Sequence, residues 1–358
     1  MEKALIAMSG GVDSSVAAFL MKQQGCDCIG CTMKLRRSTD AELPGEHTCC
    51  SLEDVEDARA VAFKLGMPYY VFNFQEDFEE KVIKKFVWCY ENGLTPNPCI
   101  DCNRYMKFEK LFDRARILGC EYIVTGHYAR IEPLGDRLLL KKAVDEKKDQ
   151  SYFLYVLTQE QLRHTRFPLG SMRKAEIRQI AEENGFVNAA KPDSQDICFV
   201  PDGDYAAFLE AYTQKTYPAG DFLNTDGAVV GRHRGAVAYT LGQRKGLGLA
   251  MGAPVYVCGK DMRRNTVTVG SNEALFHSTL YAGDWNWFPF PALTQPMRVA
   301  AKIRYRQQEQ PATVYPEADG TARVVFDSPQ RAITPGQAVV LYEGDTVVGG
   351  GTITSVGE

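Results

Sequence analysis

The first 130 residues alternate short apolar runs with stretches of helical periodicity. The apolar runs predict strands at 4–7, 28–33, 69–74 and 122–125. The periodic stretches predict helices at 16–22, 52–65, 76–90 and 107–118, with a polar loop at 34–50. Ser51, three residues before Asp54, predicts a capping box at the second helix. Strands that alternate with helices form βαβ units, so we expect an α/β fold with a doubly wound parallel sheet.

The pattern changes after about residue 160. Helical periodicity persists around 173–184, and from about residue 217 short alternating runs rich in Gly, Val, Thr and Tyr predict strands. A chain of 358 residues is also too long for one typical core. We therefore predict three domains, with a boundary near residues 201–204: a catalytic α/β domain over 1–202, a small mixed α+β domain over 203–270 and an all-β, barrel-like domain over 271–358.

Composition indicates a folded protein of the cytoplasm. Hydrophobic residues make up 45% of the chain, yet no apolar stretch approaches the ~18 residues of a membrane-spanning helix. The N-terminus enters a strand without a basic and apolar leader, so we expect cytoplasmic localisation and no membrane association. The chain contains 11 cysteines, which in a reducing compartment are thiols, metal ligands or sulfur carriers more often than disulfides.

The net charge of −4 argues weakly against a nucleic-acid partner, but it hides two basic segments. Carboxylates are absent from 227–259 and from 285–308. The basic residues of the two segments are Arg232, Arg234, Arg244 and Lys245, and then Arg298, Lys302, Arg304 and Arg306. Such surfaces suit phosphate contacts with RNA, although a solvated strand face has the same pattern.

Residues 8–15, with the sequence M-S-G-G-V-D-S-S, lie between the first predicted strand and its helix. A strand, a tight turn and a helix N-terminus form a nest of N–H groups that favours phosphate. Gly10 and Gly11 permit close approach, whereas Asp13 would hold Mg²⁺ or cap the helix. No lysine follows as in a Walker A loop, and the segment resembles the PP-loop of N-type ATP pyrophosphatases. An ordinary Gly-rich turn is the alternative.

Two cysteine-containing segments and one histidine are further candidates for chemistry. Cys99 and Cys102 lie in 95–108, where two prolines predict irregular backbone before a helix whose N-terminus would lower the pKa of the Cys102 thiol. Cys198 lies in a second polar segment, 191–199, and the two cysteine segments could be unrelated. Gly126 and His127 follow a strand and so are candidates for the ligand edge of the sheet, although a histidine there can also be solvent-exposed or satisfied by a hydrogen bond.

Taken together, the motifs resemble the tRNA-specific 2-thiouridylase family, the tRNA-uridine 2-sulfurtransferases, nearly end to end. The motifs are S-G-G-V-D-S-S (9–15), T-P-N-P-C-I-D-C-N-R-Y-M-K-F (95–108), T-G-H-Y-A-R (125–130), K-D-Q-S-Y-F-L-Y (148–155), D-S-Q-D-I-C-F (193–199) and L-G-Q-R-K-G-L-G (241–248), with R-Y-R at 304–306 and T-P-G-Q at 334–337. The resemblance implies ATP-dependent 2-thiolation of the wobble uridine of tRNA, with Mg²⁺, on glutamate, glutamine and lysine acceptors. A cysteine desulfurase or a relay protein would donate the sulfur.

The resemblance also implies roles for individual residues. Cys102 corresponds to the nucleophile and Cys198 to the persulfide carrier. The ATP site corresponds to Met8, Ser9, Gly10, Gly11, Val12, Asp13, Ser14, Ser15, Met33 and Gly126. Base contacts correspond to Asn97, Pro98 and Cys99, and other tRNA contacts to His127, Lys148, Asp149, Gln150, Arg304, Tyr305 and Gln337.

One position departs from the family pattern. Typical members carry an aspartate thought to act as an acid or base where this chain has Cys99, so Asp101 is a candidate for that role. With Cys102 and Cys198, Cys99 also resembles the ligand set of related sulfurtransferases that hold a [4Fe–4S] cluster. Three alternatives therefore stay open: a persulfide pair, a cluster on the three cysteines, and a PP-loop amidotransferase or ligase that uses neither.

Overall fold

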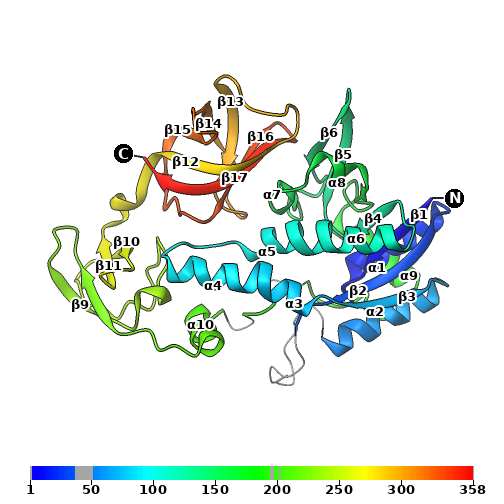
Figure 1. Cartoon of the computed structure of the whole chain (residues 1–358), viewed down its shortest axis with the longest axis horizontal. Coiled ribbons are helices and arrows are strands. Elements are labelled where there is room, and N and C mark those ends of the chain that lie inside the picture. The colour runs from blue at the N-terminus through cyan, green and yellow to red at the C-terminus, as the bar shows by residue number, and fades with distance from the viewer. Residues whose placement is uncertain (1, 37–50, 194–196, 201–202, 358) are drawn as a thin grey trace.

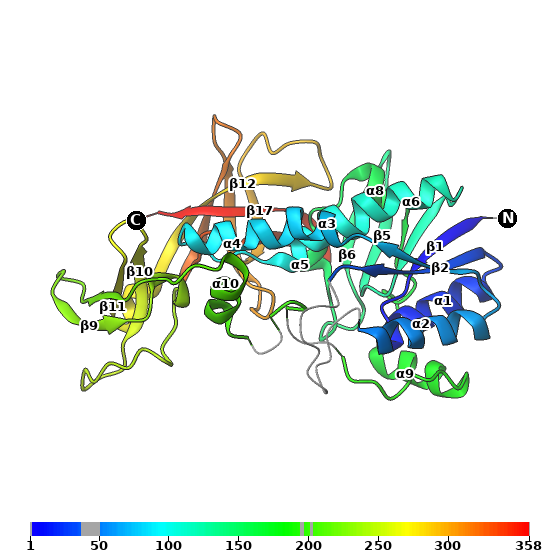
Figure 2. The ribbon, with the colours of Figure 1, turned by 60° about the horizontal axis from the view of Figure 1, so that its bottom comes forward.

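The structure is a computed structural model that describes residues 2–36, 51–193, 197–200 and 203–357. An α/β part holds the N-terminus, a small β-rich part follows, and a β-barrel holds the C-terminus (Figure 1). The two termini lie at opposite ends of the molecule (Figure 2). Most of the polar loop predicted at 34–50 and half of the boundary predicted at 201–204 lie outside the described residues.

A five-stranded parallel sheet, with the order β3-β2-β1-β4-β7, is the centre of the α/β part. Its strands are β1 (Lys3–Ala7), β2 (Asp27–Lys34), β3 (Tyr69–Asn73), β4 (Tyr122–Thr125) and β7 (Thr165–Arg166). Its helical segments are α1 (Val12–Gln23), α2 (Leu52–Lys64), α3 (Gln75–Phe78), η1 (Glu79–Ile83), α4 (Lys84–Glu91), α5 (Pro98–Asp101), η2 (Cys102–Lys110), α6 (Leu111–Ile117), α7 (Ser151–Leu154), α8 (Gln159–Arg163) and α9 (Lys174–Glu183). Helices cover both faces of the sheet, which confirms the doubly wound α/β prediction (Figure 2).

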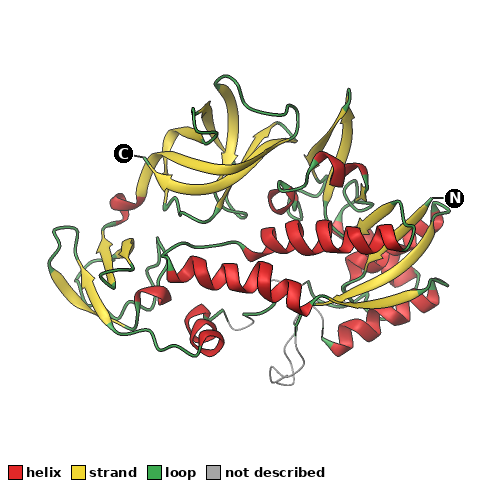
Figure 3. Ribbon diagram, viewed as in Figure 1, coloured by secondary structure: helices red, strands yellow, loops and turns green. Residues whose placement is uncertain are grey.

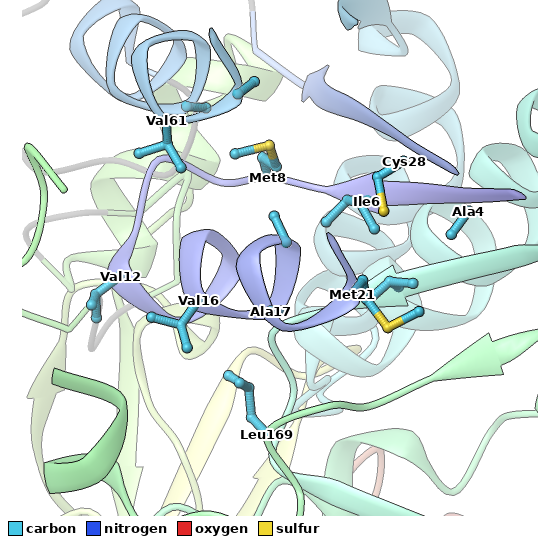
Figure 4. Close-up of a cluster of buried hydrophobic side chains, with 14 of the residues drawn as sticks. Ala4, Ile6, Met8, Val12, Val16, Ala17, Met21, Cys28, Val61 and Leu169 are labelled. Atoms are coloured by element: carbon cyan, nitrogen blue, oxygen red, sulfur yellow. The ribbon is translucent and has the colours of Figure 1, made fainter. Parts of the chain in front are cut away.

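Two apolar clusters fill the two faces of this sheet. On one face Ile6 and Met8 meet Val16 of α1 and Val61 of α2 (Figure 4). On the other face Leu5 packs in the cluster formed with α4 and α6. Successive residues of β1 therefore enter opposite clusters, and the strand is apolar on both sides because helices cover both.

The helix that carries Cys99 and Cys102 begins earlier than predicted. α5, the π-helical segment η2 and α6 follow one another without a break, so the expected helix start at residue 107 is wrong. Pro98 occupies the first helical position, where its missing N–H costs nothing. The Asn97 side chain caps the helix by accepting a hydrogen bond from the Cys99 N–H at 3.2 Å. Both cysteines therefore lie in the first two turns of a helix.

The remaining parts are a small mixed sheet and a closed antiparallel barrel, which confirms the predicted fold classes (Figure 3). The small part contains α10 (Tyr205–Thr213), β8 (Gly220–Leu223), β9 (Val229–His233), η3 (Ala236–Ala238), β10 (Tyr256–Asp261) and β11 (Thr266–Gly270). The barrel part contains η4 (Asn272–Leu275), β12 (Phe276–Trp287), β13 (Met297–Lys302), β14 (Gln310–Pro316), β15 (Ala322–Arg331), β16 (Ala338–Glu343) and β17 (Thr346–Val356). The barrel closes because β12 pairs with both β15 and β17. None of the described helices is long and apolar enough to cross a membrane.

A hairpin from the α/β part extends the barrel sheet. β5 (Ala129–Leu134) and β6 (Arg137–Lys142) pair with each other, and β6 meets β17. Asp345 links the two parts through ion pairs with Arg130 at 2.6 Å and Lys141 at 3.2 Å. The sequence pattern did not predict this hairpin, and it ties the two parts together.

Gly350 of β17 lets the barrel approach the α/β part closely. An added Cβ on Gly350 would lie 2.5 Å from the buried ring of Tyr155. Trp285 and Trp287 stack on each other with ring centroids 4.7 Å apart, and they lie against the neighbouring glycines of the same strand. Glycine therefore leaves space for Tyr155 at the junction and for the two tryptophans within the barrel.

Gly350→Ala is expected to lower the unfolding temperature, because its methyl group would overlap Tyr155 and overpacking of this kind costs about 1–3 kcal/mol. Gly283→Ala on β12 is the matched control, since its Cβ would meet only atoms 3.8 Å or more away. Thermal unfolding of the full chain measures both variants. An unchanged midpoint for Gly350→Ala would show that the ring moves aside without cost.

Candidate active site

The glycine-rich segment turns from β1 into α1 at the carboxyl edge of the sheet. Gly10 has a φ of +80°, and an added Cβ would lie 2.4 Å from the carbonyl oxygen of Asp54, so only glycine fits. Gly11 is the N-cap of α1, and no described side chain caps this helix. The Ser14 and Ser15 hydroxyls donate to the Gly11 carbonyl at 2.9 and 3.2 Å. The first turn of α1 thus keeps N–H groups and a positive dipole end for an anion.

The other residues expected at the ATP site collect around this turn. Met8 follows β1, Met33 lies near the end of β2, and Gly126 follows β4, and these three strands are neighbours in the sheet. An added Cβ on Gly126 would lie 2.8 Å from the backbone nitrogen of Ser14. The chain therefore needs glycine where it crosses the start of α1. The fold brings together residues 8–15, Met33 and Gly126, as expected of a site at the carboxyl ends of parallel strands.

Two side chains that sequence reasoning missed hold Asp13. The Lys174 ammonium lies 2.7 and 2.8 Å from the two carboxylate oxygens, and the Tyr128 hydroxyl donates to Oδ1 at 2.6 Å. Lys174 is only 8% exposed and also contacts Asp193 at 2.7 Å. The buried Lys174 ammonium therefore joins the phosphate cradle, residues 8–15, to Asp193, which lies five positions before Cys198. Without Lys174, the carboxylates of Asp13 and Asp193 would lose the positive charge that they share.

Asp193 is the centre of a group of three cations. Lys148 and Lys174 contact it at 2.6 and 2.7 Å, and Arg178 contacts it at 3.2 Å. Partial burial raises the pKa of this carboxyl, but the hydrogen bonds from Lys148 and Lys174 outweigh that effect and hold the pKa at about 2. Asp193 therefore stays ionised at any physiological pH.

Asp149 and Gln150 hold the segment that follows β4. Asp149 is buried and accepts hydrogen bonds from the N–H and the hydroxyl of Ser151 at 3.2 and 2.8 Å. The Gln150 side-chain oxygen accepts from the Tyr128 N–H at 3.0 Å, and the backbone N–H of Gln150 donates to the Tyr128 carbonyl at 2.9 Å. Lys148, Asp149 and Gln150 thus each have a partner within the fold, and their contact with tRNA remains a prediction.

His127 is buried and bonded at both ring nitrogens, so solvent exposure is excluded. Nδ1 lies 2.7 Å from the Thr125 hydroxyl and Nε2 lies 3.3 Å from the Lys107 ammonium. An ammonium can only donate, so Nε2 accepts and Nδ1 carries the proton. Burial, and then the charge of Lys107, lower the pKa of His127 well below its ordinary value. The imidazole is therefore neutral at physiological pH.

Cys102 and Cys198 meet the same apolar cluster from distant parts of the chain. Both are half-buried and pack against the cluster between the sheet and α4. The ring of Phe199 fixes the neighbourhood of Cys198 through an edge contact with Phe86, at a centroid distance of 5.1 Å. Arg36 donates to the Cys198 carbonyl at 3.2 Å. The two cysteine segments therefore lie on one side of the sheet, although residues 194–196 fall outside the described part.

Cys99 and Asp101 have different surroundings. Cys99 is exposed, whereas Asp101 is buried and contacts the Lys85 ammonium at 2.6 Å. Burial raises the pKa of Asp101, and the ion pair with Lys85 only partly opposes this effect. A carboxyl with a raised pKa suits proton transfer, so Asp101 remains a candidate for the role that Cys99 cannot fill.

A turn of the barrel between β15 and β16 holds the segment that leads to α5. The Thr95 N–H donates to the Pro335 carbonyl at 3.0 Å. The Gln337 side chain donates to the carbonyls of Thr95 and Pro96 at 2.8 and 3.3 Å. Gly336 has a φ of +92°, and an added Cβ would lie 2.9 Å from the Thr95 nitrogen. Gln337, expected to contact tRNA, therefore fixes the backbone directly before the cysteine helix.

The other two barrel residues expected to contact tRNA lie at the same junction. Arg304 donates to the Ala332 carbonyl at 2.8 Å and to the Thr334 hydroxyl at 3.3 Å. The Tyr305 ring packs on Phe153 with centroids 4.4 Å apart. Both side chains are half-buried, so each also keeps a surface that can meet a ligand.

The described side chains contain no group of three or more His, Cys, Asp or Glu residues arranged to hold a metal ion. Cys99, Cys102 and Cys198 are all described, so they do not converge as a cluster site would require, and the [4Fe–4S] alternative is not favoured. Magnesium requires fewer protein ligands than such a cluster. It retains several coordinated waters and binds through one or two carboxylates together with substrate phosphates. Asp13 at the phosphate cradle fits that requirement.

Three family models match consecutive parts of the chain. The "tRNA methyl transferase HUP domain" matches residues 2–202, the "tRNA methyl transferase PRC-barrel domain" matches 206–271, and the "Aminomethyltransferase beta-barrel domain" matches 277–353. The fold and the cradle therefore define a HUP-domain protein of the tRNA-modifying class with two β domains behind it.

Curated relatives match the chain over nearly its whole length. It is 52% identical to the tRNA-specific 2-thiouridylase MnmA of Clostridioides difficile over 355 residues, covering 98% of each chain. It is also 52% identical to the enzyme of the same name from Moorella thermoacetica over 356 residues, covering 99% of this chain and 100% of that one. The chain belongs to the family of tRNA-specific 2-thiouridylases, as its motifs predicted.

Lys174→Met is expected to slow ATP-dependent pyrophosphate release by about 100-fold or more, because a preorganised charge at the cradle is lost and Asp13 then faces the phosphates alone. Lys110→Met is the control, since it removes a half-exposed ion pair with Asp77. Pyrophosphate is measured with tRNA present, after thermal unfolding has shown that both variants fold. Release at the wild-type rate would limit Lys174 to a structural role.

His127→Gln is expected to flatten the dependence of the unfolding temperature on pH between 7 and 5. The folded-state pKa of His127 lies below its unfolded value of about 6.5, so the unfolded chain takes up the proton first. The wild-type protein therefore keeps full stability above this pH and loses it as the pH falls. His277→Gln is the control, because it removes a histidine outside this network. Equal slopes for His127→Gln and wild type would contradict the buried neutral ring.

Proposed function

We propose that this chain replaces the C2 oxygen of the wobble uridine of tRNA with sulfur, in a reaction that consumes ATP. Relatives named tRNA-specific 2-thiouridylase match it end to end, which supports ATP-dependent tRNA thiolation. The roles proposed for individual residues rest on one observation: the phosphate cradle and the two cysteines lie on the same sheet. The phosphate cradle at 8–15 lies at its carboxyl edge, and Cys102 and Cys198 pack against a single cluster on one face.

The first step activates the uridine. The C2 oxygen attacks the α-phosphorus of ATP, pyrophosphate leaves, and the oxygen becomes part of an adenylate that can depart as AMP. The start of α1 binds phosphate oxygens through its N–H groups, and Lys174 lies beside them. Magnesium, when bound near Asp13, supplies further positive charge to the phosphates.

The second step delivers sulfur. The terminal sulfur of a persulfide on Cys198 attacks C2, and AMP leaves. The Cys102 thiolate then attacks the Cys198 sulfur, the sulfur–sulfur bond to the transferred atom breaks, and its electron pair stays with the 2-thiouridine. A Cys102–Cys198 disulfide results, which a thiol reductant opens in a two-electron step. The common cluster that both cysteines contact supports this pairing.

The tRNA is positioned by residues around the cysteine helix. We assign the target base to Asn97, Pro98 and Cys99, since Asn97 caps this helix and Cys99 is exposed beside it. We also propose glutamate, glutamine and lysine tRNAs as acceptors. A cysteine desulfurase or a relay protein would supply the sulfur, and the reaction would take place in the cytoplasm, where tRNA and ATP are available.

Other reactions fit these features less well. A PP-loop amidotransferase or ligase would use the cradle but would have no use for Cys102 and Cys198. Methyl transfer, the activity in the names of two family models, does not need a cleaved nucleotide. A [4Fe–4S] cluster would need the three cysteines to converge on one point. Only thiolation through a persulfide uses the cradle and both cysteines.

Cys102→Ser and Cys198→Ser are each expected to abolish 2-thiouridine formation, because a hydroxyl neither carries persulfide sulfur nor attacks it. Pyrophosphate release should survive, since adenylation comes first. Cys258→Ser on β10 is the control and should retain thiolation, because its thiol lies in the small domain. Mass spectrometry of digested tRNA measures the product. Formation of 2-thiouridine by Cys198→Ser would show that Cys198 is not the sulfur carrier.

Protein purified without oxygen is expected to be colourless and to thiolate tRNA with a persulfide donor alone. The reason is that the three cysteines near the helix do not form a metal-ligand group. Iron analysis and visible absorption provide the measurement. A brown protein with about four irons per chain, which loses iron and activity in Cys99→Asp, would replace the persulfide mechanism with the cluster.

A further inference from the structure

Lys107 is a half-buried cation of the cysteine helix whose ammonium meets a neutral ring. Its Nζ lies 3.3 Å from Nε2 of His127, which accepts the hydrogen bond because the buried imidazole is uncharged. The other two cations of η2, Arg104 and Lys110, each contact a carboxylate, at 2.6 and 2.8 Å. No described carboxylate forms an ion pair with Lys107, so its charge is not neutralised within that part of the chain.

The surroundings of His127 fix the place of this ammonium. The Thr125 hydroxyl lies 2.7 Å from Nδ1, and the rings of Phe108 and Phe167 lie with their centroids 6.0 and 5.9 Å from the imidazole. Phe108 directly follows Lys107, so one segment supplies both the cation and a neighbour of its acceptor. The contact with His127 uses one of the three donors of the ammonium and leaves two for another partner.

The contact between Lys107 and His127 connects the cysteine helix to the edge of the phosphate cradle. Lys107 follows Cys102 by five residues in the π-helical segment η2, where residues at that spacing are one hydrogen-bonded turn apart. His127 follows Gly126, which crosses the start of α1 so closely that an added Cβ would lie 2.8 Å from the Ser14 nitrogen. The ammonium of Lys107 therefore has one of the two cysteines on its own helix and the cradle beside its acceptor.

The proposed reaction has one charged group that joins these two places. The C2 oxygen of the uridine forms a bond to the α-phosphorus of ATP while the bond to pyrophosphate breaks. The pyrophosphate end belongs to the cradle, whereas C2 must lie near the cysteines to receive sulfur. The α-phosphate lies between them, and it stays on the oxygen until the bond from C2 to that oxygen breaks and the electron pair leaves with AMP.

We propose that Lys107 is a catalytic residue whose ammonium binds the α-phosphate, first in ATP and then in the adenylated uridine. This assignment rests on the proposed function and adds a residue to its site. Negative charge develops on the phosphate as AMP leaves, and an ammonium already held beside it stabilises that charge. His127 is the positioning residue, because a neutral acceptor fixes the ammonium without neutralising it.

Lys107→Met tests this assignment in the full chain, supplied with tRNA, ATP and a persulfide donor. Release of AMP and formation of 2-thiouridine are expected to slow by about 100-fold or more, because one preorganised donor contributes about that much to a rate. Lys110→Met on the same segment is the matched control and should stay near the wild-type rate, since its ammonium is paired with Asp77. Thermal unfolding and tRNA binding of both variants should match the wild type.

ATPαS, in which sulfur replaces an oxygen of the α-phosphate, separates a phosphate contact from a structural role. One of its two diastereomers should react more slowly than ATP with the wild-type protein, because sulfur weakens the hydrogen bond to the ammonium. In Lys107→Met this slowing should shrink severalfold. The slowing by ATPβS, which is altered at the β-phosphate, should be the same in both proteins.

Lys107→Arg is the second variant, because a guanidinium keeps the charge but meets the phosphate with a different geometry. It should keep more activity than Lys107→Met and should change the effect of ATPαS alone. It therefore carries the same test if Lys107→Met does not fold.

AMP release by Lys107→Met at the rate of Lys110→Met would overturn the assignment. A slow variant that keeps the wild-type effect of ATPαS would also overturn it, because Lys107 would then serve only to hold His127 in place. Failure of the wild-type protein to form 2-thiouridine would instead overturn the proposed function, before any variant is compared.

Discussion

The hydrogen bonds between the barrel turn and Thr95 determine where the cysteine helix begins. Pro96 lies just before α5 and Pro98 is its first residue, so this stretch lacks two backbone donors and has no regular pairing. The Pro335 carbonyl and the Gln337 side chain supply partners from the far end of the chain, and Gly336 makes room for them. With this backbone fixed, the Asn97 cap, the first turn and Cys102 follow in a defined helical phase.

The sequence predicts those features that depend on neighbours along the chain. The capping box at Ser51 is present as expected, because its two hydrogen bonds join residues three apart. The four N-terminal strands and the cradle follow from apolar runs and glycines. Lys174 could not be found in this way, because a single lysine at a helix start has no periodic signal and its partner Asp13 lies 161 positions away. The early start of the helix at Pro98 was not predicted, because proline breaks a helix in its interior but is favoured at its first position.

Charge is distributed differently in the two halves of the molecule. At the cradle Asp13 and Asp193 share the ammonium of Lys174. In the described part of the β domains, Arg304 and Arg331 both approach the Cβ position of Gly242, and neither makes an ion pair with a carboxylate. The first arrangement pairs its charges within the protein, whereas the second leaves two like charges close together. A small overall charge therefore gives no indication of the partner.

The hairpin formed by β5 and β6 has a consequence for synthesis on the ribosome. Lys141 of β6 meets Thr346 of β17, so roughly 200 residues must be translated before this strand edge finds its neighbour. Until then the hairpin carries an open edge, and its cations Arg130 and Lys141 lack Asp345. Charged side chains on that edge discourage pairing with other nascent chains during the wait. The last strand to emerge thus completes a sheet begun in the first half of translation.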